Sequence, residues 1–271
     1  MKSFKQHILE KLKVSVKNTT KHTLFPKTKD ELKQMIKDEI SKNGNECSLN
    51  HIDVSEITDM SYLFRESKFN GDISTWNVSN VTDMRKMFSW SKFNGDISDW
   101  DVSNVKDMSY MFYDSYFTGD ISDWDVSNVE NMEGMFADSV FNGDISSWDV
   151  SNVEYTGSMF SSSKFNGDIS TWNVSSVRNM RYMFIDSNFN RNISKWDVSN
   201  VEDMSAMFAR SKFNGDISDW DVSKVDNMVS MFYDSAFNGD ISKWDVSNVK
   251  DMSFIFHNSP LKNNPPKWYK K

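Results

Sequence analysis

A 24-residue repeat is the feature that most constrains what this 271-residue chain can fold into. Phenylalanine recurs eight times at this spacing from residue 69, and tryptophan eight times from residue 76, with no insertion or deletion. The consensus unit reads F-N-G-D-I-S-x-W-D-V-S-N-V-x-D-M-x-x-M-F-x-x-S-x. So strict a period indicates that every unit occupies an equivalent slot in a stack, because an inserted residue would have to be looped out.

Within one unit the spacing of the apolar residues changes halfway along. Apolar residues alternate at the end of residues 73–78, so we predict a short strand there. The next apolar residues are spaced by three and four and predict one stripe on a short helix: Val81, Met84, Met87 and Phe88. Ser79 is a suitable N-cap for this helix, and residues 94–96 form a turn into the next unit. The predicted fold class is an α/β repeat solenoid whose strands pair in parallel.

Both ends of the repeat array depart from the consensus unit. Residues 49–64 fit a partial unit and eight full units follow, so we predict a repeat domain over residues 49–260. Beyond it, Leu261 and Trp268 take the Phe and Trp positions, whereas Pro265 and Pro266 replace strand-forming residues. Proline cannot donate to a strand ladder, and terminal repeats are atypical because one face meets water. We therefore predict a C-terminal cap over residues 261–271.

Residues 1–48 are predicted to form a separate helical N-terminal cap. Thr28 and Glu31 have the spacing of a capping box, apolar residues follow at helical spacing, and Asn43-Gly44 is a stop signal. An earlier stretch is also amphipathic, through Phe4, Ile8, Leu9 and Leu12. Its lysine-rich face is typical of the solvated side of a capping helix; the alternative is a surface for a membrane or a partner.

The distribution of charge argues against nucleic acid as the main partner. The net charge is −8; residues 1–48 hold eleven lysines and six acidic residues, or +5, which leaves −13 for the remainder. Phosphate binding needs clustered lysine and arginine. Cys47 is the only cysteine, so there is no intrachain disulfide framework. No apolar run approaches the roughly 20 residues of a membrane span, and no export signal is evident, so we expect no membrane insertion and, by sequence, a cytoplasmic location.

The unit string resembles the repeat of BspA-like bacterial surface proteins and mycoplasma lipoproteins, over about residues 45–260. The segment of residues 27–33 also resembles the leader that often precedes these repeats. That family is known mainly as a domain of unknown function and is treated as leucine-rich-repeat-like. The resemblance implies a right-handed, leucine-rich-repeat-like solenoid, attachment to a host or partner molecule, and a location at the cell surface or outside the cell.

Two columns of aspartate or asparagine, starting at Asp72 and Asn77, need an explanation because like charges about 5 Å apart repel. Turn N–H groups that donate to each carboxylate would lower its pKa and hold the turn. The alternative is a row of Ca²⁺ ions, which favour six to eight oxygen ligands. The glycine-rich nonapeptide of calcium β-rolls is absent and asparagine replaces some aspartates. We therefore favour hydrogen bonding, and predict neither a metal nor a cofactor.

The variable positions of the unit supply a candidate binding site. They flank the Met-Phe pair and precede the next Phe, and several carry large aromatic side chains. We predict a binding stripe made of Trp90, Tyr110, Tyr113, Tyr116, Tyr155, Tyr182, Ile185 and Tyr233. Arginine and lysine are mixed among them, and Tyr, Trp and Arg are the residues that dominate binding hot spots. The alternative is that these positions vary only because the surface tolerates it.

Catalysis has little support in the sequence. The four histidines are absent from the interior units, and there is no phosphate-binding loop, zinc-ligand spacing or nucleophile elbow. An active site also needs one unique set of groups, whereas every unit here repeats the same ones. We predict a non-enzymatic, monomeric recognition module that binds a protein or glycan, with adhesion or host interaction as its use. The alternative is a structural or assembly protein whose solenoids associate end to end or along their sheet edges.

Overall fold

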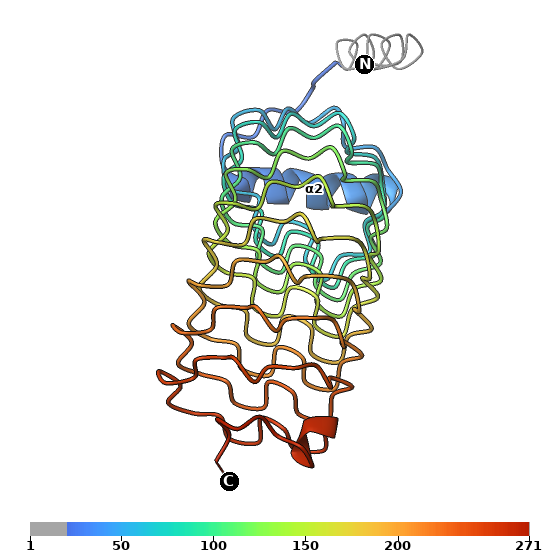
Figure 1. Cartoon of the computed structure of the whole chain (residues 1–271). Coiled ribbons are helices and arrows are strands. Elements are labelled where there is room, and N and C mark those ends of the chain that lie inside the picture. The colour runs from blue at the N-terminus through green and yellow to red at the C-terminus, as the bar shows by residue number, and fades with distance from the viewer. Residues whose placement is uncertain (1–20, 271) are drawn as a thin grey trace, which may run out of the picture.

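The computed structural model describes residues 21–270, in which the chain winds into a column of stacked coils (Figure 1). Each 24-residue unit makes one coil. Single-residue parallel bridges join neighbouring coils, always between residues 24 apart, from Asp59 with Asp83 to Asn227 with Asp251. The period of the sequence is therefore the period of the column, and equivalent residues of successive units form continuous columns.

Helices occur only at the two ends of the described chain. The α-helix α2 spans Lys29–Asn43 and precedes the coils, and the 3-10 helix η1 spans Pro260–Lys262 and follows them. The coils themselves consist of turns and single-residue bridges. Two predictions are therefore wrong: residues 73–78 do not form a strand, and residues 81–88 do not form a helix. The predicted sheet is reduced to bridges, and the right-handed, leucine-rich-repeat-like class stays a prediction.

The segment predicted as a helix is a run of tight turns. The N–H of Met87 donates to the carbonyl of Met84 at 3.1 Å, and the N–H of Ser91 to that of Phe88 at 3.2 Å. The third residue of each turn has a positive φ, 56° at Lys86 and 54° at Trp90, as a type II turn requires. The same pair of positive φ angles recurs in every coil, from residues 62 and 66 to residues 254 and 258.

Hydrogen bonds between coils explain why this segment turns instead of forming a helix. The N–H groups of Met84, Lys86 and Phe88 each donate to a carbonyl of the next coil at 2.9 Å. An α-helix would need the same N–H groups for its own carbonyls four residues back, so the two patterns exclude each other. The spacing of three and four is nevertheless real, because Met84, Met87 and Phe88 all point into the core from successive turns.

Columns of large apolar side chains fill the inside of the coils. The ring of Phe88 lies 5.7 Å from that of Phe112 in the next coil and 4.4 Å from that of Phe93. Full burial of such a side chain contributes about 1.5–3 kcal/mol, and an aromatic pair adds about 0.5–1.5 kcal/mol. Every tryptophan of the column also donates its Nε1–H to a carbonyl 27 residues earlier, as Trp100 does to Ile73 at 3.2 Å.

The acidic columns carry the hydrogen bonds that the sequence predicts. A carboxylate oxygen of Asp72 accepts the backbone N–H of Ser74 at 2.9 Å, and the side chain of Asn77 accepts that of Ser79 at 3.2 Å. Burial alone would raise the pKa of Asp72, but hydrogen bonds from Ser74 and Asn50 outweigh it and hold that pKa below its ordinary value. Each residue of these columns thus holds the turn that comes directly after it.

Two asparagine columns, which the sequence analysis missed, join the coils further. The side-chain oxygen of Asn70 accepts the backbone N–H of Asn94 at 2.7 Å, and this bond recurs along much of the column. On another side, the amide of Asn104 donates to the carbonyl of Ser79 at 2.7 Å. Ladders of stacked asparagine amides stabilise other assemblies of closely stacked chains in the same way.

Helix α2 covers the N-terminal end of the column (Figure 1). Its predicted N-cap is confirmed, because Thr28 accepts the N–H of Glu31 at 3.2 Å. Leu32 and Ile36 are buried in the same core as the coils. The predicted amphipathic stretch with Phe4, Ile8, Leu9 and Leu12 lies outside the described residues.

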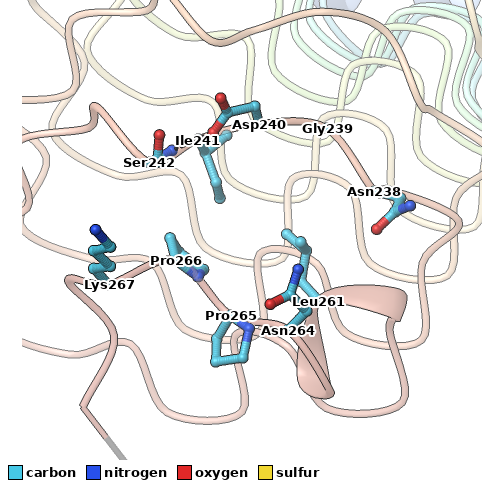
Figure 2. A pocket seen from close by; sticks show the side chains of 10 residues that line it. All are labelled: Asn238, Gly239, Asp240, Ile241, Ser242, Leu261, Asn264, Pro265, Pro266 and Lys267. Atoms are coloured by element: carbon cyan, nitrogen blue, oxygen red, sulfur yellow. Dashed lines mark hydrogen bonds between the residues drawn. The ribbon is translucent and has the colours of Figure 1, made fainter.

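The C-terminal segment lies against the last coil (Figure 2). Leu261 is buried, and the Nε1–H of Trp268 donates to the carbonyl of Ile241 at 2.8 Å, so both occupy the positions that the period assigns to them. Between residues 238–242 and residues 264–267, which include Pro265 and Pro266, a pocket remains.

Candidate functional site

The run of turns in each coil forms one side of the column, which we call the turn face. It comprises residues 84–91 and their equivalents at intervals of 24. Its inward residues are nearly invariant, whereas the residues equivalent to 85, 86, 89 and 90 change from coil to coil. Because the bridges keep all coils in register, these four positions form parallel columns of variable side chains on one surface.

Aromatic rings and cations are interleaved at the N-terminal end of the turn face. The guanidinium of Arg65 lies 4.9 Å from the ring centre of Trp90, and the ammonium of Lys86 lies 4.9 Å from that of Tyr110. Tyr113 meets Trp90 edge-on, with ring centres 4.9 Å apart. Cations are attracted to ring faces by the quadrupole of the ring. We call this group the cationic aromatic cluster; its members are Tyr62, Arg65, Arg85, Lys86, Trp90, Tyr110 and Tyr113.

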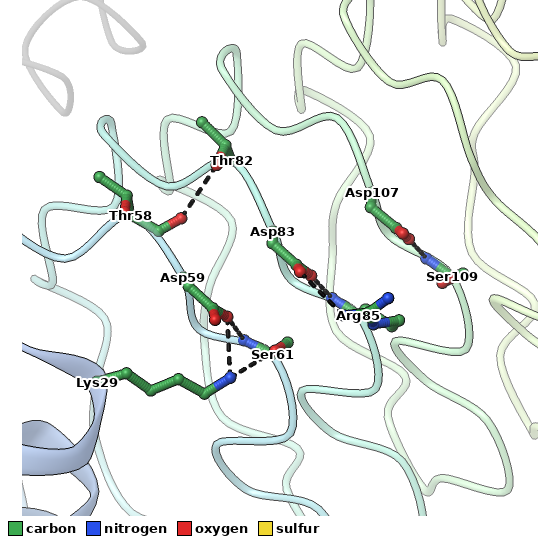
Figure 3. A network of polar contacts seen from close by, with 9 residues as sticks. All are labelled: Lys29, Thr58, Asp59, Ser61, Thr82, Asp83, Arg85, Asp107 and Ser109. Carbon is green, nitrogen blue, oxygen red and sulfur yellow. Dashed lines mark hydrogen bonds and ion pairs between the residues drawn. The ribbon is translucent and has the colours of Figure 1, made fainter.

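The cations of the cluster differ in how their charge is balanced. Arg65 pairs with Glu66 at 2.8 Å, and Arg85 pairs with Asp83 at 3.3 Å beside the paired Lys29 and Asp59 (Figure 3). Lys86 has no acidic partner within residues 21–270; its ammonium lies over the rings of Tyr62 and Tyr110. The cluster thus holds one cation whose charge no carboxylate neutralises.

Two hydrogen-bond donors in the cluster region are unused. The Nε of Arg85 and the hydroxyl of Ser89 are shielded from solvent and have no hydrogen-bond partner. Ser89 is fully buried and stands in the same column as Arg65 and Tyr113. A buried polar group without a partner costs about 1–3 kcal/mol, so both donors lower the stability of this part of the fold, and neither is exposed to a ligand at the surface.

Tyr110 connects the cluster to the middle of the turn face. Its hydroxyl donates to the carboxylate of Glu133 at 3.1 Å, and Arg181 reaches the same carboxylate at 2.8 Å from two coils further along. A Cβ on Gly134 would come within 2.3 Å of the ring of Tyr110, so this glycine, with a φ of +61°, makes room for the ring. Burial and, next, the charge of Glu133 raise the pKa of Tyr110 to about 12.

A shallow groove of about 570 Å³ lies further along the turn face, and we call it the tyrosine groove. It spans three coils: Tyr182 and Ile185 come from the first, small residues such as Ala206 and Ala209 from the second, and Tyr233 from the third. The small residues of the middle coil leave room between the rings. Arg210 also lines the groove, and Asp186 holds its guanidinium through two bonds of 2.6 and 2.7 Å.

Two of the predicted residues lie apart from the cluster and the groove. Tyr116 precedes an inward phenylalanine, and the ammonium of Lys92 lies 3.7 Å from its ring centre. Tyr155 stands in the bridge column between Asn131 and Asn179, where other coils carry aspartate or asparagine. Both tyrosines are exposed. The structure therefore gathers the other six predicted residues into two groups and leaves these two outside.

Sequence reasoning missed Tyr62, Arg65 and Glu133 as parts of this surface. Tyr62 and Arg65 lie in the partial unit, yet each stands 24 residues before Lys86 or Ser89, so the period could have placed them in the variable columns. Glu133 had no such signal, because its role depends on Tyr110 and Arg181 in other coils.

The side chains that the turn face presents are of few chemical kinds. Within the described part of the chain, no three histidine, cysteine, aspartate or glutamate side chains are placed to hold a metal ion. Of the histidines in that part, His22 and His51 lie near Asp53 and Glu39, away from the turn face, and His257 stacks on Tyr233 at 5.1 Å. The turn face presents rings, guanidinium and ammonium groups and carboxylates.

Comparison with known proteins identifies the repeat. The model of the DUF285 family, described as a Mycoplasma protein of unknown function, matches residues 30–139, 114–188 and 163–268. No match was found among curated proteins or among solved structures. None of the helices described is long and apolar enough to cross a membrane. Since the three matches together cover most of the sequence, the chain belongs to the DUF285 family of Mycoplasma proteins of unknown function.

Proposed function

We propose that this protein is a non-enzymatic recognition module that binds a protein or glycan partner through its turn face. The placement of the variable aromatic side chains carries the proposal. Trp90, Tyr110 and Tyr113 gather in the cationic aromatic cluster, and Tyr182 and Tyr233 line the tyrosine groove. Rings of this kind give large contact areas at a low cost in conformational entropy, and with arginine they make up most binding hot spots.

The backbone of the turn face supports recognition by side chains. Along the described coils, alternate N–H groups donate to the next coil and the others close turns, as Lys86 and Met87 do. Between the first and the last coil, the face therefore offers no free strand edge to which an extended peptide could add. A partner therefore contacts side chains that project from a backbone hydrogen-bonded to the coil before it and the coil after it. Because this backbone is already ordered, binding costs less conformational entropy.

Adhesion or attachment to a host molecule is the use that we propose for this surface. The resemblance of the repeat to that of BspA-like bacterial surface proteins supports this use. So does the division of each unit into a nearly invariant frame and a few variable positions. Such a division allows the ligand to change between relatives without a change in the frame.

Binding to protein and glycan arrays, with matched alanine variants, tests the proposal. We expect Trp90→Ala, or Tyr182→Ala combined with Tyr233→Ala, to lose the partner that the unaltered protein captures. Tyr116→Ala is the matched control, because Tyr116 is more exposed than Trp90, 55% against 40%, but lies outside both groups. A partner that is retained by all these variants would contradict binding through the turn face.

A structural or assembly role is the second candidate, and one feature of the last coil favours it. In inner coils the N–H groups equivalent to those of Met252, Phe254 and Phe256 donate to a following coil, as Phe232 does to Ile255 at 3.0 Å. In the last coil these three have no acceptor among the described residues. Sedimentation separates the candidates: polymers that grow with concentration support assembly, and a monomer at all concentrations supports the recognition module.

A further inference from the structure

We propose that the cationic aromatic cluster binds an acidic sugar residue of a glycan, through the carboxylate or sulfate group of that sugar. The inference rests on the proposed function of the turn face and deepens it by naming the ligand chemistry of one part. Three features of the cluster carry it: a cation without a carboxylate partner, two exposed guanidinium groups, and an exposed indole ring.

Charge favours an anionic ligand at this place. The ammonium of Lys86 lies over two tyrosine rings and has no carboxylate partner among the described residues. The protein as a whole carries a net charge of −8, so most of its surface repels an anion, and an exposed cation without a carboxylate partner marks a place where one can bind. The tyrosine groove lacks this feature, because Asp186 neutralises Arg210 there.

The exposed guanidinium groups favour an oxyanion in particular. The side chains of Arg65 and Arg85 are 40% and 42% exposed, whereas the Nε of Arg85 and the hydroxyl of Ser89 are shielded from solvent. A carboxylate or sulfate offers several acceptor oxygens, and charge-assisted hydrogen bonds to such groups are stronger than neutral ones. The anion would thus accept hydrogen bonds from the exposed ends of the two guanidinium groups and balance the charge of Lys86.

The rings favour a sugar as the carrier of that anion. Trp90 is 40% exposed, and its ring is steadied by Arg65 and by the edge contact with Tyr113. The part of the indole that Arg65 and Tyr113 leave exposed is an apolar platform for the C–H face of a pyranose ring, and the surrounding polar groups can meet the hydroxyls of the sugar. An acidic peptide fits less well, because its main chain would find no free backbone edge along these coils.

Titration calorimetry of the full chain with charged and uncharged forms of the same oligosaccharides tests the inference. Hexagalacturonate and its fully methyl-esterified form differ only in the free carboxylates, and sulfated maltohexaose and maltohexaose differ only in the sulfates. We expect at least one charged form to bind at least tenfold more tightly than its uncharged form. Hexaglutamate serves as the acidic peptide.

Substitutions in the cationic aromatic cluster test whether the charged oligosaccharide binds there. We expect Lys86→Ala and Trp90→Ala each to weaken it about tenfold or more, and Lys86→Arg to retain it. Lys106→Ala is the matched control, because it removes the same charge from an exposed lysine outside the cluster and should leave binding within about twofold. Thermal unfolding of each variant verifies that it is folded.

Four results would overturn the inference: no binding of either charged oligosaccharide, equal binding of the charged and uncharged forms in both pairs, equal or tighter binding of hexaglutamate, or equal loss in Lys86→Ala and Lys106→Ala. The proposed function fails separately, when an array partner of any chemistry is retained by the turn-face variants. A partner that depends on Tyr182 and Tyr233 while the charged sugars fail would leave the proposed function intact.

Discussion

The interior of the column and its turn face use the same residue types under different constraints. Phe160 in the core has no exposed surface, and its ring stacks on that of Phe165 at 4.2 Å and on that of Phe184 at 5.8 Å. Phe254 on the turn face is 65% exposed and meets only the edge of His257, with ring centres 6.1 Å apart. The first belongs to a column present in every coil, and the second has no equivalent in most of them.

This difference separates stability from specificity within one unit. The core columns, the tryptophan N–H bonds and the asparagine ladders repeat along the stack, so each coil stabilises its neighbours in the same way. The turn face is held by backbone bonds that do not depend on its outward side chains, as between Lys86 and Ser109. Its residues can therefore change without loss of the frame, and a partner can be recognised there.

The largest contrast is expected from removing the same ring on the two sides. Phe160→Ala should lower the free energy of unfolding by about 3–5 kcal/mol, because it leaves a cavity in a closely packed core. Phe254→Ala should change it by less than about 0.5 kcal/mol, as surface substitutions usually do. Chemical denaturation of both variants measures the difference. Losses of similar size would mean that the turn face contributes to the stability of the coil.

An intermediate contrast is expected from the two kinds of tryptophan. Trp148 is buried and donates to the carbonyl of Ile121 at 3.1 Å, so Trp148→Phe should cost about 1–3 kcal/mol through lost packing and a lost hydrogen bond. Trp90→Phe keeps an exposed ring and should be neutral within about 0.5 kcal/mol. Chemical denaturation of both variants measures these changes. An equal loss of stability at both sites would contradict the separation of a stabilising core from a turn face that can vary.

The sequence could predict the parts of the fold that repeat. The period, the buried Phe, Trp and Met columns, the Thr28 cap and the position of Trp268 all follow from spacing and hydrophobicity. The prediction of a helix over residues 81–88 was wrong because a run of turns also places inward residues at intervals of three and four. A signal for those turns was present: Gly134 and Asp138 stand at positive-φ positions, where glycine and aspartate are enriched.

The candidate site could be predicted only in part. Periodicity placed Trp90, Tyr110 and Tyr113 at variable positions, and the structure brings them into contact. The unused donors of Arg85 and Ser89 could not be found from spacing, because they depend on how neighbouring side chains cover them. Contacts such as that between Arg181 and Glu133, two coils apart, have no signature in a single unit.

Acid should change the contributions of two carboxylates to stability in opposite directions: Asp72, which holds a turn of the frame, and Asp138, which lies on the turn face. Burial would raise the pKa of Asp72, but hydrogen bonds outweigh burial and lower it. The ionised carboxylate therefore stabilises the fold above about pH 4. This contribution is lost as the pH falls through the pKa that Asp72 has in the folded protein. Asp72→Asn should therefore be less stable than the unaltered protein at pH 7, and the difference should shrink as the pH falls through the lowered pKa of Asp72.

At Asp138 on the turn face, burial and the charge of Asp114 raise the pKa, so the ionised form opposes folding. Its favourable contribution is present at low pH and is lost as the pH rises through the raised value. Asp138→Asn should therefore be more stable than the unaltered protein at pH 7, and equal to it near pH 3. Thermal unfolding across this pH range measures both variants. Shifts of the same sign would show that hydrogen bonding does not distinguish the two carboxylates.

The smallest effect is expected from a single hydroxyl of the turn face at alkaline pH. Burial and then Glu133 raise the pKa of Tyr110 from 10.0 to about 12, so folding favours its neutral form. The stability that this provides is present below pH 10 and is lost as the pH rises toward 12. Tyr110→Phe cannot ionise, so its stability should fall less between pH 10 and 12, and its ultraviolet titration should lack the late-ionising tyrosine. Because the hydroxyl is only one of the contacts that hold Glu133, which Arg181 also binds at 2.8 Å, the change at pH 7 should stay within about 0.5 kcal/mol. A larger loss of stability at pH 7 would mean that the contacts between Tyr110, Glu133 and Arg181 help to hold the coil itself. If the variant lost as much stability as the unaltered protein between pH 10 and 12, Glu133 would not bind the hydroxyl in solution.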